Sequence, residues 1–597
     1  MRYVKCGSLC GLALAVVVGL FSARASRTDA QTANAGKNEP AAQFGKKIAD
    51  FTLPDAAGKP VSLADFKDRK AVVVVFVGTQ CPINNYYMPR LVELHKEYAE
   101  KGVQFLAINS NRQDTAEEIA QHAKQHSLPF PVLKDDAGKV ADTFAAQRTP
   151  EVYVLDGERA VRYVGRIDDQ YGIGYQRAKP TRRDLAEALD EVLAGKPVGT
   201  AQTAVAGCLI GRPVKPKAEG QVTFTKHVAP VLQKHCQECH RPGQIGPMAL
   251  LTYDDAAAWS GTIREVVQER RMPPWHADPK HGKFSNDRSL PKADADTLLA
   301  WVDAGCPEGD AKDLPAAREF ASVEWTIGKP DVVFTMPREF TVPAQTPRGG
   351  VPYQYFIVPT NFKEDMWVQA VEARPGNRAV VHHILVYART LAKGNARDGI
   401  GDGLIATQAP GELPTVLPAG TAKKIPKGSA IVFQMHYTPN GTEVKDRSSV
   451  GLIFAKEPPK HEARTRAIAG RRIAIPPGDA NYQVTSTTTF AEEVQLLSML
   501  PHMHLRGKSF EYRVTPPNGK EDVLLSVPRY DFGWQANYRL DKPLLLPAGT
   551  RIDCSAYFDN SANNPNNPDP TKQVRWGDQT WEEMMIGFVD YAVPLGK

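Results

Sequence analysis

The heptapeptide Pro501-His502-Met503-His504-Leu505-Arg506-Gly507 stands near the end of the 597-residue chain and follows a mostly apolar stretch, Val494 to Leu500. Side chains alternate between the two faces of a β-strand, so an H-x-H pair on a strand aims both imidazoles in one direction. The heptapeptide therefore predicts a strand that delivers two convergent imidazoles to a metal site.

Three other stretches carry ligands of matching type. His382-His383 lies in an apolar run, His436 follows Phe433-Gln434-Met435, and Met584 follows Glu582-Glu583. Imidazole plus one thioether suits copper that cycles between Cu(I) and Cu(II), because soft sulfur favours the reduced ion. Adjacent His382 and His383 point to opposite faces of a regular strand, so joint binding of one metal requires a bulge or a strand end.

The order of these motifs resembles the copper type II, ascorbate-dependent monooxygenases, the family of the peptide-amidating and dopamine-hydroxylating enzymes. The resemblance covers roughly the last 270 residues and implies two all-β sandwich (jelly-roll) domains, residues 320–460 and 461–597. It implies two copper ions and an external reductant such as ascorbate. The ligands it implies are His382, His383 and His436 for the electron-transfer copper, and His502, His504 and Met584 for the catalytic copper.

The substrate is less well indicated. Peptide-amidating members place an arginine two residues before the H-x-H motif to bind the substrate carboxylate, and Leu500 stands at that position here. Both a small molecule and a peptide therefore remain candidates for the substrate that reacts with O2.

The overall composition is that of an ordinary globular protein, with 42% hydrophobic and 23% charged residues. The length predicts about three to five domains. The 73 basic and 67 acidic residues are mixed along the chain. Nothing in this distribution indicates a nucleic-acid partner.

The N-terminus has the parts of a secretory signal. Arg2 and Lys5 precede an apolar run from Gly11 to Phe21, and Ala23-Arg24-Ala25 follows. The run is too short to span a bilayer, so residues 1–25 are expected to be a signal peptide cleaved after Ala25. Residues 26–45 are expected to be a linker, and the mature protein to be periplasmic or secreted, with no later membrane span.

Residues 46–200 alternate strand and helix patterns, as in an α/β sheet. A buried strand is predicted over 71–77, followed by a helix that starts at Cys81-Pro82. Strands over 103–108 and 151–155 and a helix over 115–126 follow.

Cys81 at a strand-to-helix turn and the later Thr149-Pro150 resemble the thioredoxin-like redoxin family, in which that Thr-Pro bond is cis and faces the cysteine. A helix N-terminus lowers a thiol pKa. Asn84 replaces the second cysteine of a C-x-x-C motif, and Thr79 is one residue closer to the cysteine than in peroxiredoxins. A dithiol therefore needs a distant partner, for which Cys208 is nearest in sequence; the alternative is a fold without thiol chemistry.

Residues 216–312 contain Cys236-Gln-Glu-Cys239-His240, the attachment pattern of c-type haem with the histidine as axial ligand. A disulfide and half of a zinc site are the competing interpretations, although a second C-x-x-C for zinc is missing from the sequence. The region resembles the small all-α cytochromes c. The resemblance implies Met272, before Pro273, as the sixth iron ligand, with His276 and His235 as alternatives.

Together these patterns favour an O2-dependent copper monooxygenase that hydroxylates a C–H bond, with electrons supplied through the fused haem. One rival is a non-catalytic haem, copper and thiol electron-transfer protein. Another is a thiol oxidoreductase with accessory domains. A redox partner protein stays open as a further partner.

Overall fold

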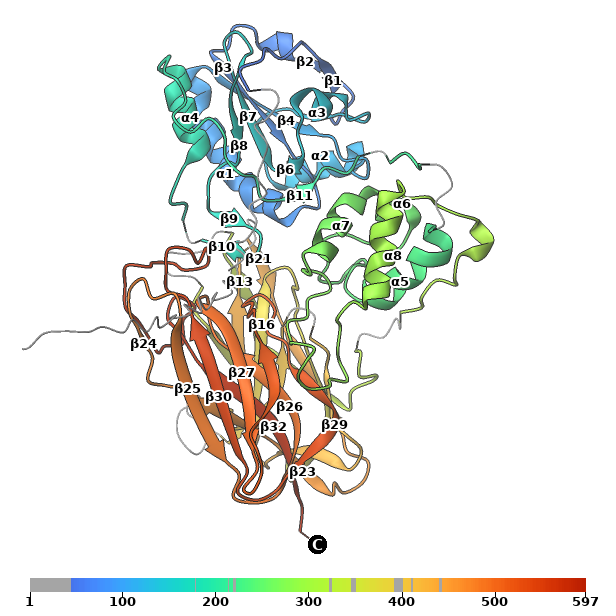
Figure 1. The fold of residues 1–597 in the computed structure, drawn as a ribbon, viewed down its shortest axis with the longest axis vertical. Coiled ribbons are helices and arrows are strands. Elements are labelled where there is room, and N and C mark those ends of the chain that lie inside the picture. Colours follow the sequence, from blue (N-terminus) through green and yellow to red (C-terminus); the bar gives the residue numbers. More distant parts are fainter. Residues whose placement is uncertain are drawn as a thin grey trace, which may run out of the picture. The chain divides into compact units, whose positions relative to one another are not determined.

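The computed structural model describes residues 44–177, 179–212, 214–217, 222–320, 325–344, 351–390, 401–409, 412–439 and 443–596, all within one structural unit, Asn38–Lys597. The expected signal peptide and nearly all of the expected linker lie outside these residues. Figure 1 shows helices and strands in the first part of the described chain and mainly strands after it.

An α/β domain comes first, built on a five-stranded sheet of order β5-β4-β3-β7-β8. Strand β3 (Ala71–Phe76) is fully buried and contributes alternate residues to the cores on its two faces, which explains its continuous apolar run. The other strands are β4 (Val103–Asn109), β5 (Val132–Lys134), β7 (Glu151–Asp156) and β8 (Val161–Gly165), and the helices are α1 (Pro82–Tyr98), α2 (Ala116–Gln125), α3 (Lys139–Phe144) and α4 (Asp184–Leu193). These elements confirm the predicted alternation.

Short strands complete the domain: β1 (Thr52–Pro54), β2 (Pro60–Ser62), β6 (Arg148–Thr149), β9 (Tyr171–Gly172), β10 (Tyr175–Gln176) and β11 (Cys208–Leu209). Strand β11 pairs with β6, and Ile210 joins the buried core around Phe144. Residues 201–210, beyond the expected boundary at 200, therefore pack on this domain.

A small helical region follows, with α5 (Ala229–His235), α6 (Tyr253–Ala258), α7 (Ser260–Gln268) and α8 (Lys292–Asp303). Trp301 is fully buried at its centre and packs with Val228, Leu232 and Leu298. In the described residues, no helix is both long and apolar enough to cross a membrane.

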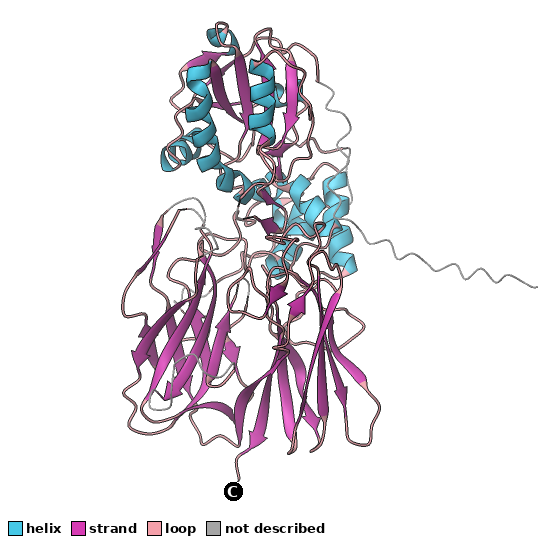
Figure 2. Cartoon of the chain, turned by 90° about the vertical axis from the view of Figure 1, so that its left-hand side faces the viewer, coloured by secondary structure: helices cyan, strands magenta, loops and turns pink. Residues whose placement is uncertain are grey.

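The remainder is a large β region (Figure 2). In its first half, β14 (Gln354–Pro359), β20 (Ser429–Tyr437), β16 (Val381–Thr390) and β17 (Leu404–Gln408) face β12 (Val332–Thr335), β22 (Ser449–Phe454), β15 (Met366–Arg374), β18 (Thr415–Val416) and β19 (Thr421–Ile425). In its second half, β25 (Tyr482–Thr489), β30 (Arg551–Phe558), β27 (Gly507–Thr515) and β28 (Asp522–Val527) face β23 (His461–Ala469), β32 (Ile586–Pro594), β26 (Val494–His502) and β29 (Tyr538–Leu546). Short strands β13 (Phe340–Val342), β21 (Val444–Asp446), β24 (Ala474–Ile475) and β31 (Val574–Arg575) lie outside these sheets.

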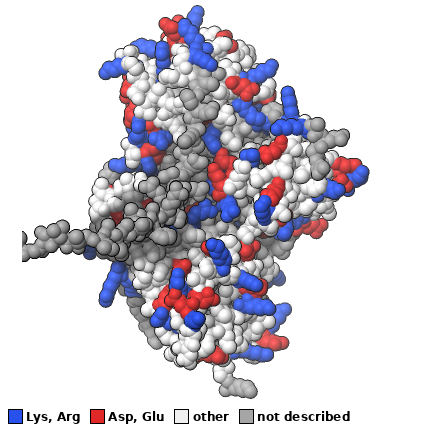
Figure 3. Space-filling view, in the orientation of Figure 1, with Lys and Arg blue, Asp and Glu red and all other residues white. Residues whose placement is uncertain are grey.

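One nine-stranded sheet runs through both halves, because β19 pairs in parallel with β23. A shared apolar cluster joins them as well, with Tyr387 and Val432 from one half and Leu500 and Phe588 from the other. Backbone hydrogen bonds and apolar side-chain contacts therefore join the two halves. On the face drawn in Figure 3, acidic and basic side chains are interspersed, as the sequence indicates.

Candidate functional sites

A cluster of three histidines forms where β16 meets β20. The pairing of these strands is irregular between Val381 and His383, which is one of the two geometries that joint binding requires, and His383 faces His436 directly. The Nδ1 atoms of His382 and His383 lie 3.1 Å apart. Ligand atoms of all three histidines lie within 4.8 Å of one another. Because the bulge brings His382 to the same side as His383, all three side chains are positioned to bind one metal ion.

The second ligand set lies at the end of β26. The strand ends at His502, so His504 stands in the following turn, yet the two rings are 5.2 Å apart. The carboxylate of Glu583 accepts hydrogen bonds from the backbone N–H of His504 at 2.9 Å and of Arg506 at 2.6 Å. These bonds hold the loop that carries Met584 against the H-x-H segment.

The hydrogen bonds of the imidazole rings show which ring nitrogens remain available to bind a metal. His502 Nδ1 is 2.6 Å from Gln535 Oε1, and His504 Nδ1 is 3.2 Å from the carbonyl oxygen of Glu582. Each contact fixes one ring nitrogen and leaves Nε2 for a ligand. His504 Nε2 and His436 Nδ1 are buried and have no hydrogen-bond partner among the described residues. Two such orphaned nitrogens fit a bound metal better than an empty polar core.

Burial lowers the pKa of every histidine in the two sets, to about 4 for His382 and about 3 for His504. The repulsion between neighbouring imidazoles adds to this effect at His383 and His436. The rings are therefore neutral at pH 7, which is the form that binds metals. Five imidazoles and one thioether fit copper.

The two sets meet at one cavity of about 110 Å³, lined by His383, His502 and Met584. The rings of His383 and His502 are 6.5 Å apart. Phe532 stacks on His382 at 4.9 Å and approaches His504 at 6.1 Å, so it lies between the sets. The rest of the cavity wall is mainly tyrosine, leucine, glutamine and phenylalanine side chains.

The C-x-x-C-H motif directly follows α5. Cys236 and Cys239 form no disulfide in the described chain. His240 Nδ1 lies 3.3 Å from the carbonyl oxygen of Met248, which leaves its Nε2 available to an iron. Two free thiols beside such an imidazole fit covalent c-type haem.

The candidates for the second axial ligand differ in their surroundings. Met272 comes just after α7, and its N–H donates to the Val266 carbonyl at 3.2 Å. His235 Nε2 is engaged by Asp294 at 2.9 Å. Both ring nitrogens of His276 are buried without a hydrogen-bond partner in the described chain. This contact thus disfavours His235 and leaves Met272 and His276.

The thiol site lies at the start of α1, where Cys81 is almost fully buried. Its Sγ is 3.1 Å from the carbonyl oxygen of Thr149, whose bond to Pro150 is cis as expected. A Cβ at Gly78 would lie 2.6 Å from Asn111 Nδ2, so the turn before Cys81 needs a glycine.

Cys208 lies at this site because β11 pairs with β6, which places Cys208 opposite Thr149. Its N–H donates to Cys81 Sγ at 3.5 Å. Burial raises the pKa of Cys81, but hydrogen bonds from the Cys208 thiol and from the N–H groups of Asn84 and Cys208 lower it to about 7. The Cys208 thiol has its pKa raised well above the ordinary value, so it is the proton donor of the pair.

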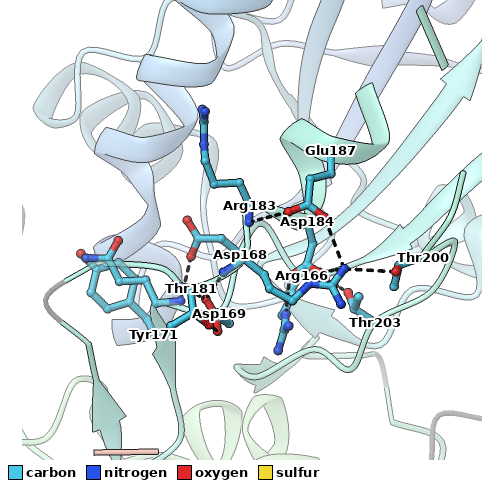
Figure 4. Close-up of polar contacts among 12 residues, drawn as sticks. Arg166, Asp168, Asp169, Tyr171, Thr181, Arg183, Asp184, Glu187, Thr200 and Thr203 are labelled. Atoms are coloured by element: carbon cyan, nitrogen blue, oxygen red, sulfur yellow. Dashed lines mark hydrogen bonds and ion pairs between the residues drawn. The ribbon is translucent and has the colours of Figure 1, made fainter. Parts of the chain in front are cut away.

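A polar network lies beside α1 (Figure 4). Arg166 Nε donates to Asp184 at 2.7 Å, and the Thr181 N–H donates to Asp169 at 2.7 Å. Tyr171, from the same segment, packs on the core that α1 helps to form. Arg90 of α1 donates to Asp168 at 2.8 Å, which ties this segment to the helix that begins after Cys81.

Three residues of the copper-type sites were not found from the sequence: Gln535, Phe532 and Glu583. Glu583 stands next to a predicted ligand, which is a weak signal for a supporting carboxylate. Gln535 and Phe532 belong to a loop without a recognisable motif, and only tertiary structure brings them to the histidines.

The five-stranded sheet, the buried cysteine at the start of a helix and the cis proline define the first domain as thioredoxin-like. Residues 44–164 match the AhpC/TSA family, so the chain belongs to that family through this domain.

Two curated relatives and one solved structure illustrate the similarity. The thiol-disulfide oxidoreductase ResA of Bacillus thuringiensis subsp. konkukian (strain 97-27) is 34% identical over 119 residues, 20% of this chain and 67% of the relative. The chloroplastic peroxiredoxin Q of Sedum lineare is 29% identical over 155 residues, 24% of this chain and 82% of the relative. A hypothetical protein of known structure from Sinorhizobium meliloti 1021 is 36% identical, with a TM-score of 0.26 over 28% of this chain and 94% of its own.

Proposed function

We propose that the β region is a copper-dependent monooxygenase that hydroxylates a C–H bond. The observation that carries this proposal is that both ligand sets reach one cavity: His383 lines it from the first β half, and His502 and Met584 line it from the second. The reaction balances as R–H + O2 + 2 e⁻ + 2 H⁺ giving R–OH + H2O. Copper, when bound, supplies the one-electron chemistry toward O2, and the electrons come from the fused c-type haem and an external reductant such as ascorbate.

The chain's own residues orient the ligands and exclude water. Gln535 and the Glu582 carbonyl fix the two H-x-H rings, and Glu583 fixes the Met584 loop. Leu500 and Phe588 close the cavity with apolar surface. Leu500 stands in this wall where peptide-amidating enzymes have an arginine, so we do not propose a peptide carboxylate as the group that is bound there.

The test uses the full mature chain. We expect two copper ions and one iron per chain, and O2 uptake that depends on both ascorbate and an added substrate from a panel of small aromatic and aliphatic compounds. His504→Ala should abolish that uptake, whereas His461→Ala, which changes a histidine outside the site, should not. Metal-loaded protein without substrate-dependent uptake would leave the non-catalytic electron-transfer protein as the better description.

A second function is favoured by the juxtaposition of Cys81 and Cys208 and by the match to thiol-disulfide oxidoreductases. The pair would reduce a disulfide of a partner protein: Cys81-SH + Cys208-SH + RSSR gives the Cys81–Cys208 disulfide + 2 RSH. Cys81→Ser should abolish insulin reduction and His504→Ala should not. We also propose export with cleavage after Ala25, which N-terminal sequencing of the secreted fraction tests.

A further inference from the structure

A second cavity, of about 90 Å³, lies beside the C-x-x-C-H motif and is not the cavity of the copper-type sites. Cys239 lines one side of it. Arg378, just before β16, and Val381, the first residue of β16, line another side, and Arg288 from the segment before α8 also contributes. The cavity thus joins the haem-attachment cysteine to the strand that carries His382 and His383.

In the described chain, the acidic side chains around this cavity have hydrogen-bond or ion-pair partners, whereas two of the arginines do not. Each lining carboxylate has a partner: Glu238 pairs with Arg318 at 2.8 Å, Glu372 accepts from the Ile327 N–H at 3.1 Å, and Glu412 accepts from Thr407 Oγ1 at 2.6 Å. Arg288 and Arg378 form no hydrogen bond or ion pair with any residue that the structure describes.

The surroundings of Arg378 also destabilise the charged form of its guanidinium group. Burial lowers its pKa, the charge of Arg374 acts in the same direction, and the charge of Glu372 acts in the opposite direction without cancelling them. Nearby, Arg241 has a buried Nε without an acceptor in the described chain. Half-buried guanidinium groups without acceptors are costly, so they indicate an anionic ligand.

We propose that Arg288 and Arg378 form a carboxylate-binding site that holds the propionate groups of a haem attached to Cys236 and Cys239. The guanidinium fork matches a carboxylate in geometry and charge. This inference rests on the proposed haem and deepens its role. A free carboxylate ligand would have the same chemistry, so the experiment separates the two.

The site has a consequence for electron supply. Thr407, Gln408 and Glu412 line both this cavity and the one that contains His383 and His502. The two cavities therefore share part of one wall. This arrangement suits the haem as the immediate electron donor.

The experiment uses full-length, haem-loaded protein and the variants Arg288→Gln, Arg378→Gln and the double variant. Removing positive charge near the haem favours its oxidised form, so spectroelectrochemical titration should give a lower reduction potential, with the largest decrease in the double variant. Haem content per chain reports folding and attachment. Arg338→Gln, an exposed arginine outside the cavity, is the matched control and should leave the potential unchanged.

The outcomes are distinguishable. Protein without covalent haem overturns the proposed haem and this site together. Protein with normal haem content but an unmoved potential in both single variants overturns the arginine site alone. If succinate raises the thermal midpoint of haem-loaded wild type but not of Arg378→Gln, the arginines bind a free carboxylate and the propionate assignment is wrong.

Discussion

The Nδ1 atoms of His382 and His383 lie 3.1 Å apart although these residues are neighbours on β16. Two nitrogens bound to one metal at about 2.0 Å are separated by roughly this distance. The irregular pairing of β16 with β20 makes the approach possible. The backbone is thus shaped for joint ligation, at a place where a regular strand would separate the side chains.

The first prediction concerns the three-histidine set. His383→Ala removes its central ligand, so we expect copper content to fall from two ions to about one per chain. Reoxidation should slow, because the second electron loses its route. Elemental analysis and stopped-flow absorbance measure the two effects. An unchanged copper stoichiometry would rule out a metal site at these histidines.

The second prediction concerns Met584. Met584→His keeps a ligand but replaces the soft sulfur that favours Cu(I). Copper should stay bound, and the electron paramagnetic resonance signal of one site should change. Hydroxylation should fall by more than the roughly 10–100-fold that changes to outer-shell partners cost. Met584→Leu is the matched control for side-chain size and should lose copper from that site. Turnover that persists in Met584→His would mean that the other site is catalytic.

The third prediction concerns the haem. Protein made with a haem-attachment system should give a c-type pyridine haemochrome, because the thiols of Cys236 and Cys239 are free and His240 is oriented. Cys236→Ser should retain at most a single thioether bond, which shifts the haemochrome band. His235→Ala should leave the spectrum unchanged, because Asp294 already occupies that imidazole. A colourless wild-type protein would refute the assignment.

Local patterns were enough to predict the elements of the thioredoxin-like domain, because β3 and α1 are decided by a continuous apolar run and by Cys81-Pro82. The fixed spacing of the C-x-x-C-H and H-x-H motifs also indicated candidate haem-attachment and metal-ligand residues. The position of Cys208 beside Cys81 depends on β11 pairing with β6, about 60 residues earlier in the chain, and no local signal encodes that pairing. Phe532 reaches the histidines in the same non-local way.

The fourth prediction is the pH dependence of Cys81. With a pKa of about 7, half of this thiol is thiolate at neutral pH, and thiolate absorbance near 240 nm should rise through that value. Cys208→Ala removes a hydrogen bond that lowers the pKa, so the titration should move to higher pH and the thiolate at pH 7 should fall by roughly 10-fold. Cys81→Ser provides the baseline. Identical curves for wild type and Cys208→Ala would mean that Cys208 does not tune this thiol.

The last prediction concerns the ion pair that crosses the two β halves. Lys423 on β19 donates to Asp590 on β32 at 3.1 Å, and both side chains are largely buried. Lys423→Met leaves Asp590 without its cation, which should destabilise the β region by about 3–5 kcal/mol. Replacing both residues, in Lys423→Met/Asp590→Leu, removes the uncompensated charge and should recover much of that loss.

Calorimetry of the full chain measures this effect, and Lys445→Met is the matched control. Lys445 pairs with Glu339 at the surface, with side chains 67% and 54% exposed, so its loss should move the unfolding transition little. If the double variant is no more stable than Lys423→Met, the buried pair contributes net attraction between the halves. If Lys423→Met itself leaves the transition unmoved, the pair does not hold the halves together, and their placement depends on the shared sheet and the apolar cluster around Leu500 and Phe588.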